Sequence, residues 1–481
     1  TPLHAFSTES LSIVFRCGPV GLPGSSSVLV SFPVDHDISQ ASAPTGVAGL
    51  TGSVQSAVEG QLLTLTRNGG TDVAAGTLVT VVVEGVKSLY AGHTGVYTIR
   101  TVSTADGRLM EHHLSVDGSE IIPAEMVVSS LVLGSPVAGA DTTLELEATL
   151  GGVLNYQGRD GGRILIEMPE GFEPLGTLSY SLEISEEWRR GVLAATGRSQ
   201  TGANCSASWL RCYGVVQLDH SPPGAGGDDN SEWEPATTFR LTLQLVRARP
   251  FAGATGAFNI VVTSAAGQLS ARGAAAGVTL VPNELASAAL LPARVPTATM
   301  RGFNVSFTTA NVVPPNVDLI VSLPPGLLLT VFLAVRSPAL GAALSLNAAY
   351  SDRATVTVKR RGGTVLPRGA AVELLFTGLS TRGLSGATGE VGLEMRVAET
   401  GTMDVAPAFP GPHLYYRAPE AREAAPCNAG ALGGAVVTVS GAHFGAAEAN
   451  SNTLAPFAHR AVVVGGSVSA ETLWTSDSSL A

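Results

Sequence analysis

One strand-like run that ends in proline occurs three times in this chain and decides its fold. The three copies are Val30-Ser-Phe-Pro33, Ile166-Glu-Met-Pro169 and Val321-Ser-Leu-Pro324. Each copy lies in a stretch with the two-residue period of a β-strand. Proline then ends the strand, because it has no N–H to donate to a sheet. We therefore expect the three prolines to occupy equivalent positions at a strand end.

Two further blocks accompany each copy in the same order. Alternating stretches lie upstream, at Leu11–Phe15, Leu144–Ala148 and Phe303–Phe307. Blocks that begin with glycine lie downstream, at Gly95–Ile99, Gly256–Ile260 and Gly389–Leu393. Three ordered blocks that occur three times indicate an internal repeat. We expect the three leading glycines to occupy equivalent turns.

The second repeat is longer than the other two. Proline and glycine are separated by 62 residues in the first repeat, 65 in the third and 87 in the second. The second repeat therefore carries an insertion, which we place in the irregular stretch around 196–234. This stretch holds Cys205 and Cys212, and two cysteines seven positions apart in such a segment readily reach disulfide geometry. We predict a local disulfide between them.

Alternating Val, Ile and Thr, interrupted by Gly, Asn or Pro, is typical of short antiparallel strands. Helical periodicity is weak throughout, and Glu420–Ala425 would form one turn at most. Repeats of this kind are most simply immunoglobulin-like β-sandwiches, although the paired core cysteines and their tryptophan are missing. We expect an all-β, extended rod with sandwiches at 1–124, 125–283 and 284–413. Short linkers are expected near Ile121–Ala124, Val281–Asn283 and Pro410–Pro412.

The final stretch, 414–481, has a different pattern. It contains Gly433-Gly-Ala-Val-Val-Thr-Val-Ser-Gly-Ala-His-Phe-Gly445, followed by Ala461-Val-Val-Val-Gly-Gly466. These motifs resemble the opening of an IPT/TIG domain, the immunoglobulin-like module of plexins and of many large surface proteins. The resemblance implies a partial sandwich whose glycines form tight turns and whose Phe444 fills one end.

The segment Glu471–Leu480 resembles stretches of green-algal surface proteins that run on into a cysteine. This resemblance implies that Cys427 has its disulfide partner shortly after Ala481. Together with the bias toward Ala, Gly, Val and Arg, it implies a large extracellular or flagellar-surface glycoprotein of the mastigoneme or flagellar-membrane-glycoprotein kind. Because Thr1 is not an initiator methionine and Ala481 falls inside a module, we expect the chain to be a segment of a longer protein.

Composition and charge exclude several classes of function. The 481 residues are 45% hydrophobic and only 14% charged, with a net charge of −11. Such a chain would not neutralise a run of phosphates, so we expect no nucleic-acid partner. The longest apolar stretch, Leu327–Val335, is far shorter than the ~20 residues of a membrane-spanning helix. Only Lys87 and Lys359 are lysines, and we attribute the excess of arginine to base composition rather than to arginine chemistry.

Candidate catalytic and metal-binding groups are sparse. His112 and His113 would point to opposite faces of a strand and could not readily share a metal ion. Asp35–Asp37 fits a solvated loop better than a cation site, and the acidic run Asp228–Glu234 lacks EF-hand spacing. The sequence contains no nucleophile elbow, zinc-protease motif or Walker A loop. We therefore expect no enzyme activity, cofactor or metal.

Two N-x-S sequons make Asn204 and Asn304 candidate glycosylation sites. Trp188, Trp209 and Trp233 could form a sugar-binding face, but packing in the core or a loop is the favoured interpretation. We expect a non-enzymatic structural and assembly segment of an extracellular filament or coat, which contacts other protein subunits and has glycans as further candidate partners. Two alternatives stay open: a carbohydrate-binding adhesion module, and an accessory scaffold of an enzyme whose catalytic domain lies outside these residues.

Overall fold

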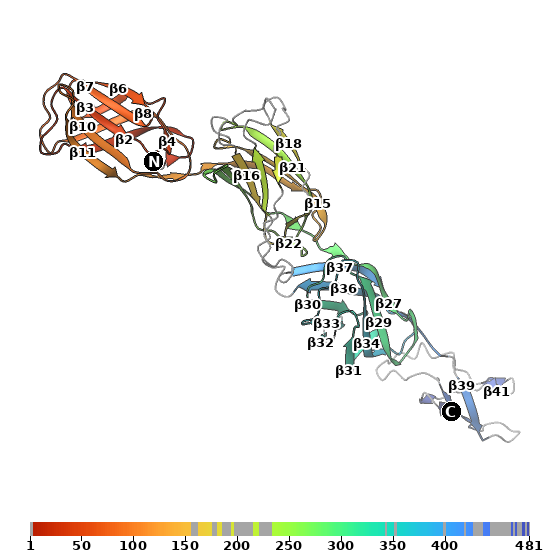
Figure 1. The fold of residues 1–481 in the computed structure, drawn as a ribbon. Helices are drawn as coiled ribbons and strands as arrows, with labels where there is room; N and C mark the ends of the chain where they lie inside the picture. The colour runs from red at the N-terminus through yellow and green to blue at the C-terminus, as the bar shows by residue number, and fades with distance from the viewer. Residues whose placement is uncertain are drawn as a thin grey trace. The chain divides into compact units, whose positions relative to one another are not determined.

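The computed structural model describes fifteen stretches of the chain. They are residues 3–154, 162–175, 180–184, 194–196, 215–220, 233–341, 344–350, 354–397, 401–417, 420–426, 436–442, 463–464, 467–468, 474–476 and 479–480. All regular elements in these stretches are β-strands (Figure 1). The chain forms two compact units, one of residues 1–136, 141–249 and 254–279, the other of 137–140, 250–253 and 280–481.

The first sandwich lies in the first unit and packs two sheets face to face. One sheet has the order β2 (Thr8–Arg16), β8 (Leu78–Ser88), β4 (His36–Asp37), with β5 (Ser42–Ala48) also paired to β8. The other has the order β11 (Leu109–Val116), β10 (Tyr97–Ser103), β3 (Ser26–Ser31), β7 (Leu62–Asn68), β6 (Ser53–Glu59). A small third sheet contains β1 (Leu3–His4), β12 (Glu120–Ile122) and β9 (Gly92–His93). Alternate residues of β3, β7 and β8 form the core between the two large sheets.

The second sandwich follows in the same unit and repeats this order. Its larger sheet is β13 (Ala124–Glu125), β24 (Leu269–Ala275), β23 (Phe258–Ser264), β16 (Gly162–Glu167), β20 (Val215–His220), β19 (Ala194–Thr196). The facing sheet is β14 (Val127–Leu133), β15 (Asp141–Thr149), β21 (Thr238–Arg247), β17 (Glu173–Pro174), with β18 (Tyr180–Ile184) paired to β21. The first expected linker is thus drawn into strands, because β12 ends at Ile122 and β13 begins at Ala124.

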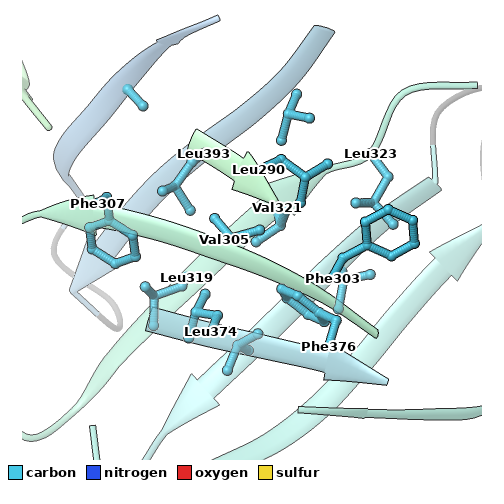
Figure 2. Packing of buried hydrophobic residues seen from close by; sticks show 14 of the residues in the cluster. Leu290, Phe303, Val305, Phe307, Leu319, Val321, Leu323, Leu374, Phe376 and Leu393 are labelled. Carbon is cyan, nitrogen blue, oxygen red and sulfur yellow. The ribbon is translucent and has the colours of Figure 1, made fainter. Parts of the chain in front are cut away.

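The third sandwich lies in the second unit. Its larger sheet is β26 (Asn283–Glu284), β37 (Gly401–Pro410), β36 (Glu390–Val397), β30 (Val317–Ser322), β33 (Ala354–Arg360), β32 (Leu344–Tyr350). The facing sheet is β27 (Ala286–Leu291), β29 (Met300–Thr308), β34 (Ala371–Thr381), β31 (Leu327–Arg336). A small sheet joins β28 (Arg294–Pro296), β38 (His413–Tyr415) and β35 (Gly386–Ala387). Inward-facing Phe, Leu and Val side chains from both large sheets interdigitate to form its core (Figure 2).

The final module contributes a small sheet and a hairpin. The sheet has the order β39 (Glu420–Ala425), β40 (Thr438–Ala442), β44 (Ser479–Leu480), β43 (Trp474–Ser476). Residues 420–425 form a strand, because their backbone pairs with β40. The sequence analysis had allowed one helical turn there, and that prediction is wrong. The hairpin pairs β41 (Val463–Val464) with β42 (Ser467–Val468), on either side of the glycine pair that the sequence indicated.

The three prolines occupy equivalent places, as the repeated blocks predict. Each comes two residues after the central strand of the larger sheet, which is β3, β16 or β30. The register on the next strand is also the same, since Val30 pairs with Ile99, Ile166 with Ile260 and Val321 with Leu393. A Cβ atom added to the leading glycine of the downstream block would lie 3.0, 3.5 and 3.5 Å from the proline Cβ in the three repeats. The proline therefore lies beside the glycine in all three sandwiches.

The range placed as an irregular insertion, 196–234, contains a regular strand. Strand β20 pairs with the central strand β16 over six residues, and Val216 and Leu218 are buried in the core. The prediction of an irregular stretch is therefore wrong for residues 215–220. The exact domain boundaries at 124, 283 and 413 stay predictions.

A β-bulge recurs at one position in the smaller sheet of each sandwich. The register shifts there in β8, β21 and β34, opposite Leu11, Leu144 and Phe303. The bulge places Gly85, Leu245 and Gly378 in the left-handed region, with φ of 78°, 60° and 80°. At Gly85 the backbone is also crowded, because an added Cβ would lie 2.3 Å from the Gln40 carbonyl oxygen.

Gly85→Ala is expected to destabilise the first sandwich by about 2–4 kcal/mol. Roughly 1 kcal/mol comes from left-handed backbone in a residue with a Cβ, and the rest from the contact with the Gln40 carbonyl. Gly76→Ala is the matched control, since Gly76 has φ 80° but open space around it. Denaturant dependence of amide hydrogen exchange in β8 measures both changes. Equal losses in the two variants would contradict the steric explanation.

Two arginines are buried at equivalent positions of the first and third sandwiches. Arg67 pairs with Ser26 and Arg360 with Val317, at the same register, and they are 2% and 1% exposed. Their guanidinium groups donate to carbonyl oxygens of several loops: Arg67 to those of Leu22, Pro23, Thr51 and Thr71, Arg360 to those of Pro314, Leu340 and Thr364. Arginine chemistry is therefore used at these two positions, because a planar fork with five donors satisfies carbonyls that would otherwise be buried unpaired; the attribution of the overall excess of arginine to base composition stays a prediction.

Arg360→Lys is expected to lower the free energy of unfolding of the third sandwich by about 2–3 kcal/mol. The ammonium cannot reach three divergent carbonyls, so buried acceptors lose their partners. Arg361→Lys is the control one residue away, because Arg361 is half-exposed and pairs with Asp318 at 2.7 Å. We expect that variant to lose less than about 1 kcal/mol. Hydrogen exchange in β33 resolves the comparison, and an equal loss in both variants would refute a special role for Arg360.

Candidate interaction surfaces

The outer face of the β27–β29–β34–β31 sheet in the third sandwich carries a group of exposed apolar side chains, with Glu373 and Arg336 as exposed charges beside them. Alternation points Phe303 and Val305 into the core and their neighbours outward. Leu291 is 49% exposed and Leu375 is 44% exposed, and both pair across the sheet with Asn304. Met300 and Leu328, more than half and about half exposed, both lie opposite Ser380 on the same face. We call these residues, together with the β31 bulge described next, the apolar face.

A wide bulge in β31 projects two large side chains from this sheet. Pairing with β34 is interrupted between Leu329 and Ala334, and Val331 and Phe332 are 90% and 71% exposed. Thr330 donates from its hydroxyl to the Gly378 carbonyl at 2.5 Å, which fixes the bulge to the sheet. Gly378 allows this approach, because an added Cβ would lie 2.4 Å from the Phe332 carbonyl oxygen. The bulge is thus held by defined contacts while its side chains face solvent.

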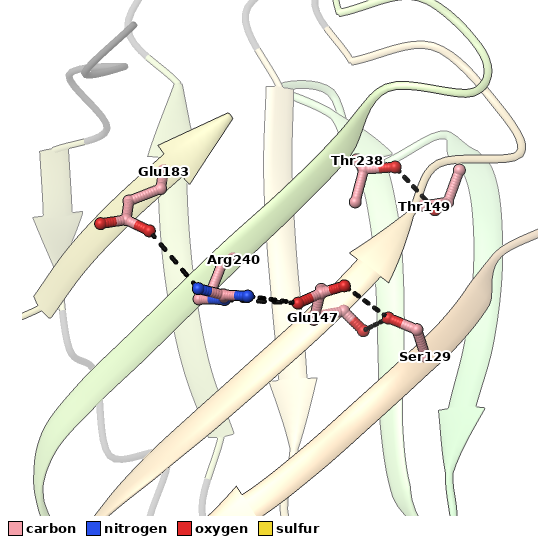
Figure 3. A network of polar contacts seen from close by, with 6 residues as sticks. All are labelled: Ser129, Glu147, Thr149, Glu183, Thr238 and Arg240. Carbon is pink, nitrogen blue, oxygen red and sulfur yellow. Dashed lines mark hydrogen bonds and ion pairs between the residues drawn. The ribbon is translucent and has the colours of Figure 1, made fainter. Parts of the chain in front are cut away.

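The equivalent face of the second sandwich is charged (Figure 3). Arg240 forms a 2.8 Å ion pair with Glu147 and approaches Glu183 at 3.9 Å. Hydrogen bonds from Arg240 and then from Ser129 hold the pKa of Glu147 below its ordinary value. By register, Thr242 here corresponds to Leu375 of the third sandwich. The ion-pair network of the second sandwich therefore occupies part of the face that is apolar in the third, while Val132, the counterpart of Leu291 by register, is 52% exposed there.

The candidate glycosylation site Asn304 lies in the centre of the apolar face. It is half-buried on β29, between Leu291 and Leu375. A glycan at Asn304 would cover this face, so glycan occupancy and protein contact there would exclude each other. Glycosylation of Asn304 stays a prediction.

The Asp35–Asp37 segment is not a solvated loop throughout. His36 is 1% exposed in β4, its Nε2 lies 2.5 Å from the Tyr97 hydroxyl, and burial lowers its pKa. The two acids are engaged nearby, since Asp35 accepts from the Gly95 amide at 3.2 Å and Asp37 from the Ser39 amide at 2.9 Å. The expectation of a solvated segment is wrong for His36, because the strand pairing of β4 places its ring in the core beside Phe32.

Other sequence candidates have varied outcomes. His112 and His113 are both exposed on β11, and no group of three or more His, Cys, Asp or Glu side chains in the part of the chain that the structure describes could hold a metal ion. Trp233 is buried and packs against Phe239, with ring centroids 6.1 Å apart, as the core interpretation predicted. Several candidates lie outside the described residues: Cys205, Cys212, Asn204, Trp188, Trp209, Phe444, Cys427 and residues 228–232.

Cys17 is described and forms no disulfide. It is buried in the core of the first sandwich, and burial, followed by the Glu111 carboxylate, raises the pKa of its thiol. A buried thiol of raised pKa is poorly reactive. No helix that could cross a membrane occurs in the stretches that the structure describes.

The sequence analysis missed a buried acid, Asp404, in β37. It is fully buried, and its two carboxylate oxygens accept from the Asn311 side-chain amide at 2.7 Å and from the Asn311 backbone amide at 3.3 Å. Burial raises its pKa to about 6, although the hydrogen bonds from Asn311 oppose the shift. Asn311 also donates to the Ala138 carbonyl at 3.1 Å, so one amide joins three segments of the second unit. No sequence motif marks this pair.

The stability of the second unit should depend on pH through Asp404. Its folded pKa, about 6, lies above the ordinary 3.8, so the folded state binds this proton more tightly than the unfolded state. The stabilisation is complete below about pH 4 and is lost as the pH rises through about 6, by at most about 3 kcal/mol. Thermal unfolding from pH 4 to 7.5 should show this slope in the wild type and not in Asp404→Asn. Identical slopes would show that Asp404 does not titrate as stated.

Comparisons with known proteins show no family for this chain. No protein-family model and no curated protein matches the chain. Similar solved structures include the C-terminal domain of the antigen I/II-family protein AspA of Streptococcus pyogenes, with 10% identity, TM-score 0.23, and coverage of 58% of this chain and 94% of that one. BcpA, the major pilin subunit of Bacillus cereus, has 8% identity, TM-score 0.22, and coverage of 83% and 93%. The Escherichia coli adhesin FdeC has 12% identity, TM-score 0.19, and coverage of 85% and 99%.

At these identities and scores the comparisons carry no argument about fold or function, and the fold class rests on the strands and sheets of the structure itself. The chain is an all-β protein whose tandem sandwiches resemble immunoglobulin-like domains. This confirms the expected all-β class with tandem sandwiches, while the extended rod stays a prediction.

Proposed function

We propose that this chain is a non-enzymatic structural segment of an extracellular filament or coat, in which copies of the chain contact one another through the apolar face of the third sandwich. The observation that carries the proposal is the exposure of Leu375, Val331 and Phe332 on a sheet whose counterpart in the second sandwich carries an ion-pair network. Clustered exposed apolar side chains of this kind mark interaction sites on soluble proteins.

The chemistry of this face suits contact between protein subunits. Its centre has few charges, so association has a small desolvation cost, and Phe332 on its bulge can enter a pocket or groove as an anchor. Arg336, which lies opposite Leu375 on β31, is an exposed charge at its edge. An apolar centre with a polar border is the usual organisation of a protein–protein interface.

The finer assignment rests on the sequence resemblances. The IPT/TIG-like motifs and the green-algal character of Glu471–Leu480 favour a cell-surface or flagellar glycoprotein, with domains at 1–124, 125–283, 284–413 and 414–481. The burial of Trp233 removes one of three tryptophans from an aromatic sugar platform and weighs against a carbohydrate-binding module.

Phe332→Asp tests this function. A charge at a 71% exposed position should leave the fold intact and weaken self-association at least tenfold. Val127→Asp is the matched control, because Val127 is 60% exposed on the second sandwich, outside the apolar face. Sedimentation velocity of the enzymatically deglycosylated chain over a range of concentrations measures association directly. A wild-type chain that stays monomeric at all concentrations, or equal weakening by both variants, would contradict the proposal.

A further inference from the structure

Two strands of the first sandwich are edges where the other two sandwiches have paired strands. In the second and third sandwiches, β14 pairs with β15 and β27 with β29, while β13 and β26 pair with β24 and β37. In the first sandwich, β2 corresponds to β15 and β29, and β11 corresponds to β24 and β37. Both β2 and β11 are the last strands of their sheets. No described residue pairs with their outer edges.

In the second and third sandwiches, one connecting segment in each covers this side. It reads Pro123-Ala-Glu-Met126 in the second and Pro282-Asn-Glu-Leu285 in the third, and each is followed by an apolar strand. Its first part, β13 or β26, pairs in parallel with β24 in the second sandwich or β37 in the third. Its second part, β14 or β27, pairs antiparallel with β15 or β29 in the same sandwiches. Met126 and Leu285, at the change from one sheet to the other, are only 3% and 1% exposed. One extended strand therefore completes both sheets and fills the gap between them.

The gap is open in the first sandwich. A groove of about 780 Å³ lies between β2 and β11, and its lining includes Phe15, Ile99, Met110, Glu111 and Val116. Core-facing Leu11 and Phe15 of β2 are only partly buried. Their counterparts by register are fully buried: Leu144 and Ala148 in the second sandwich, Phe303 and Phe307 in the third.

The backbone of β11 has a carbonyl group at the position where β24 and β37 accept a hydrogen bond from the connecting segment. Met126 donates from its N–H to the Arg272 carbonyl at 2.9 Å, and Leu285 donates to the Val405 carbonyl at 3.0 Å. His112 is the counterpart of Arg272 and Val405 by register on the neighbouring strand. Because a residue in an antiparallel strand points its N–H and C=O to the same side, those of His112 face the groove rather than β10.

We propose that this groove is a strand-binding site for the connecting segment of a further repeat of the same kind. The ligand is one extended polypeptide strand of the pattern Pro-x-Glu-apolar followed by alternating apolar residues. Its apolar fourth residue enters the gap beside Phe15 and Met110, and the N–H of that residue donates to the His112 carbonyl. The strand comes from outside residues 1–481, because both segments of this type within the chain are paired in their own sandwiches.

The connection to β1 supports this register. Strands β1 and β28 are equivalent, since each pairs in parallel with the strand that closes its sandwich, β12 or β38. Two residues separate the end of β27 from the start of β28. By this equivalence, the strand that we propose would end beside the start of β1, as β27 ends beside the start of β28.

The site is tested with a fluorescein-labelled peptide of residues 122–133 as the probe. We expect saturable binding to the full chain by fluorescence anisotropy, and no binding by the same peptide with aspartate in place of Met126. His112→Pro should weaken binding at least tenfold, because it removes the outward N–H and crowds the edge without breaking a bond to β10. His112→Ala is the control, since it keeps the backbone groups and should bind like the wild type. Circular dichroism verifies that both variants are folded.

A second arm joins residues 122–133 directly ahead of Thr1 and measures hydrogen exchange of β2 and β11. Slower exchange together with free-peptide binding supports a strand site open to other molecules. Slower exchange without free-peptide binding supports the same occupant delivered by the same polypeptide. Unchanged exchange with no peptide binding, or equal binding by His112→Pro and the wild type, would overturn the proposal. None of these outcomes depends on the apolar face, so this site and the proposed function fail separately.

Discussion

The pairing of the central strand with its downstream neighbour is the constraint on which each sandwich depends. Strands β3, β16 and β30 pair on both sides, so their backbone groups are satisfied and their side chains alternate between core and outer face. A one-residue slip would turn Val30, Ile166 or Val321 out of the core. The proline that follows ends the ladder and lies beside the glycine that precedes the neighbouring strand, which is β10, β23 or β36.

Two other features recur around this ladder, a β-bulge and a buried arginine. Both meet a need of the backbone, for left-handed φ or for hydrogen-bond donors, and neither follows from the alternation of side chains. The bulge in the smaller sheet needs left-handed backbone, which glycine supplies twice and Leu245 once. Loop carbonyls at one end of the first and third sandwiches need donors, and Arg67 and Arg360 provide them. These solutions hold the loops against the sheets and leave outer faces and edges free to differ between repeats.

Function is expected where the repeats differ. The second sandwich has ion pairs on the face where the third has exposed leucines and the Phe332 bulge. The first sandwich has a groove where the others have a strand. Both differences offer a surface to another polypeptide, one by side-chain packing and the other by backbone hydrogen bonds. Among the residues that the structure describes, no group of three or more His, Cys, Asp or Glu side chains is placed to hold a metal ion.

The sequence by itself determined the all-β class, the three repeats and the equivalence of Pro33, Pro169 and Pro324, because a period of two and a residue without an N–H are local properties. It did not reveal that His36, Arg67, Arg360 and Asp404 are buried. Polar side chains enter a core only when distant segments supply partners, as Tyr97 does for His36 and Asn311 for Asp404. Only the tertiary structure decided which face is apolar and which edge is open, since both depend on pairing between strands far apart in the chain.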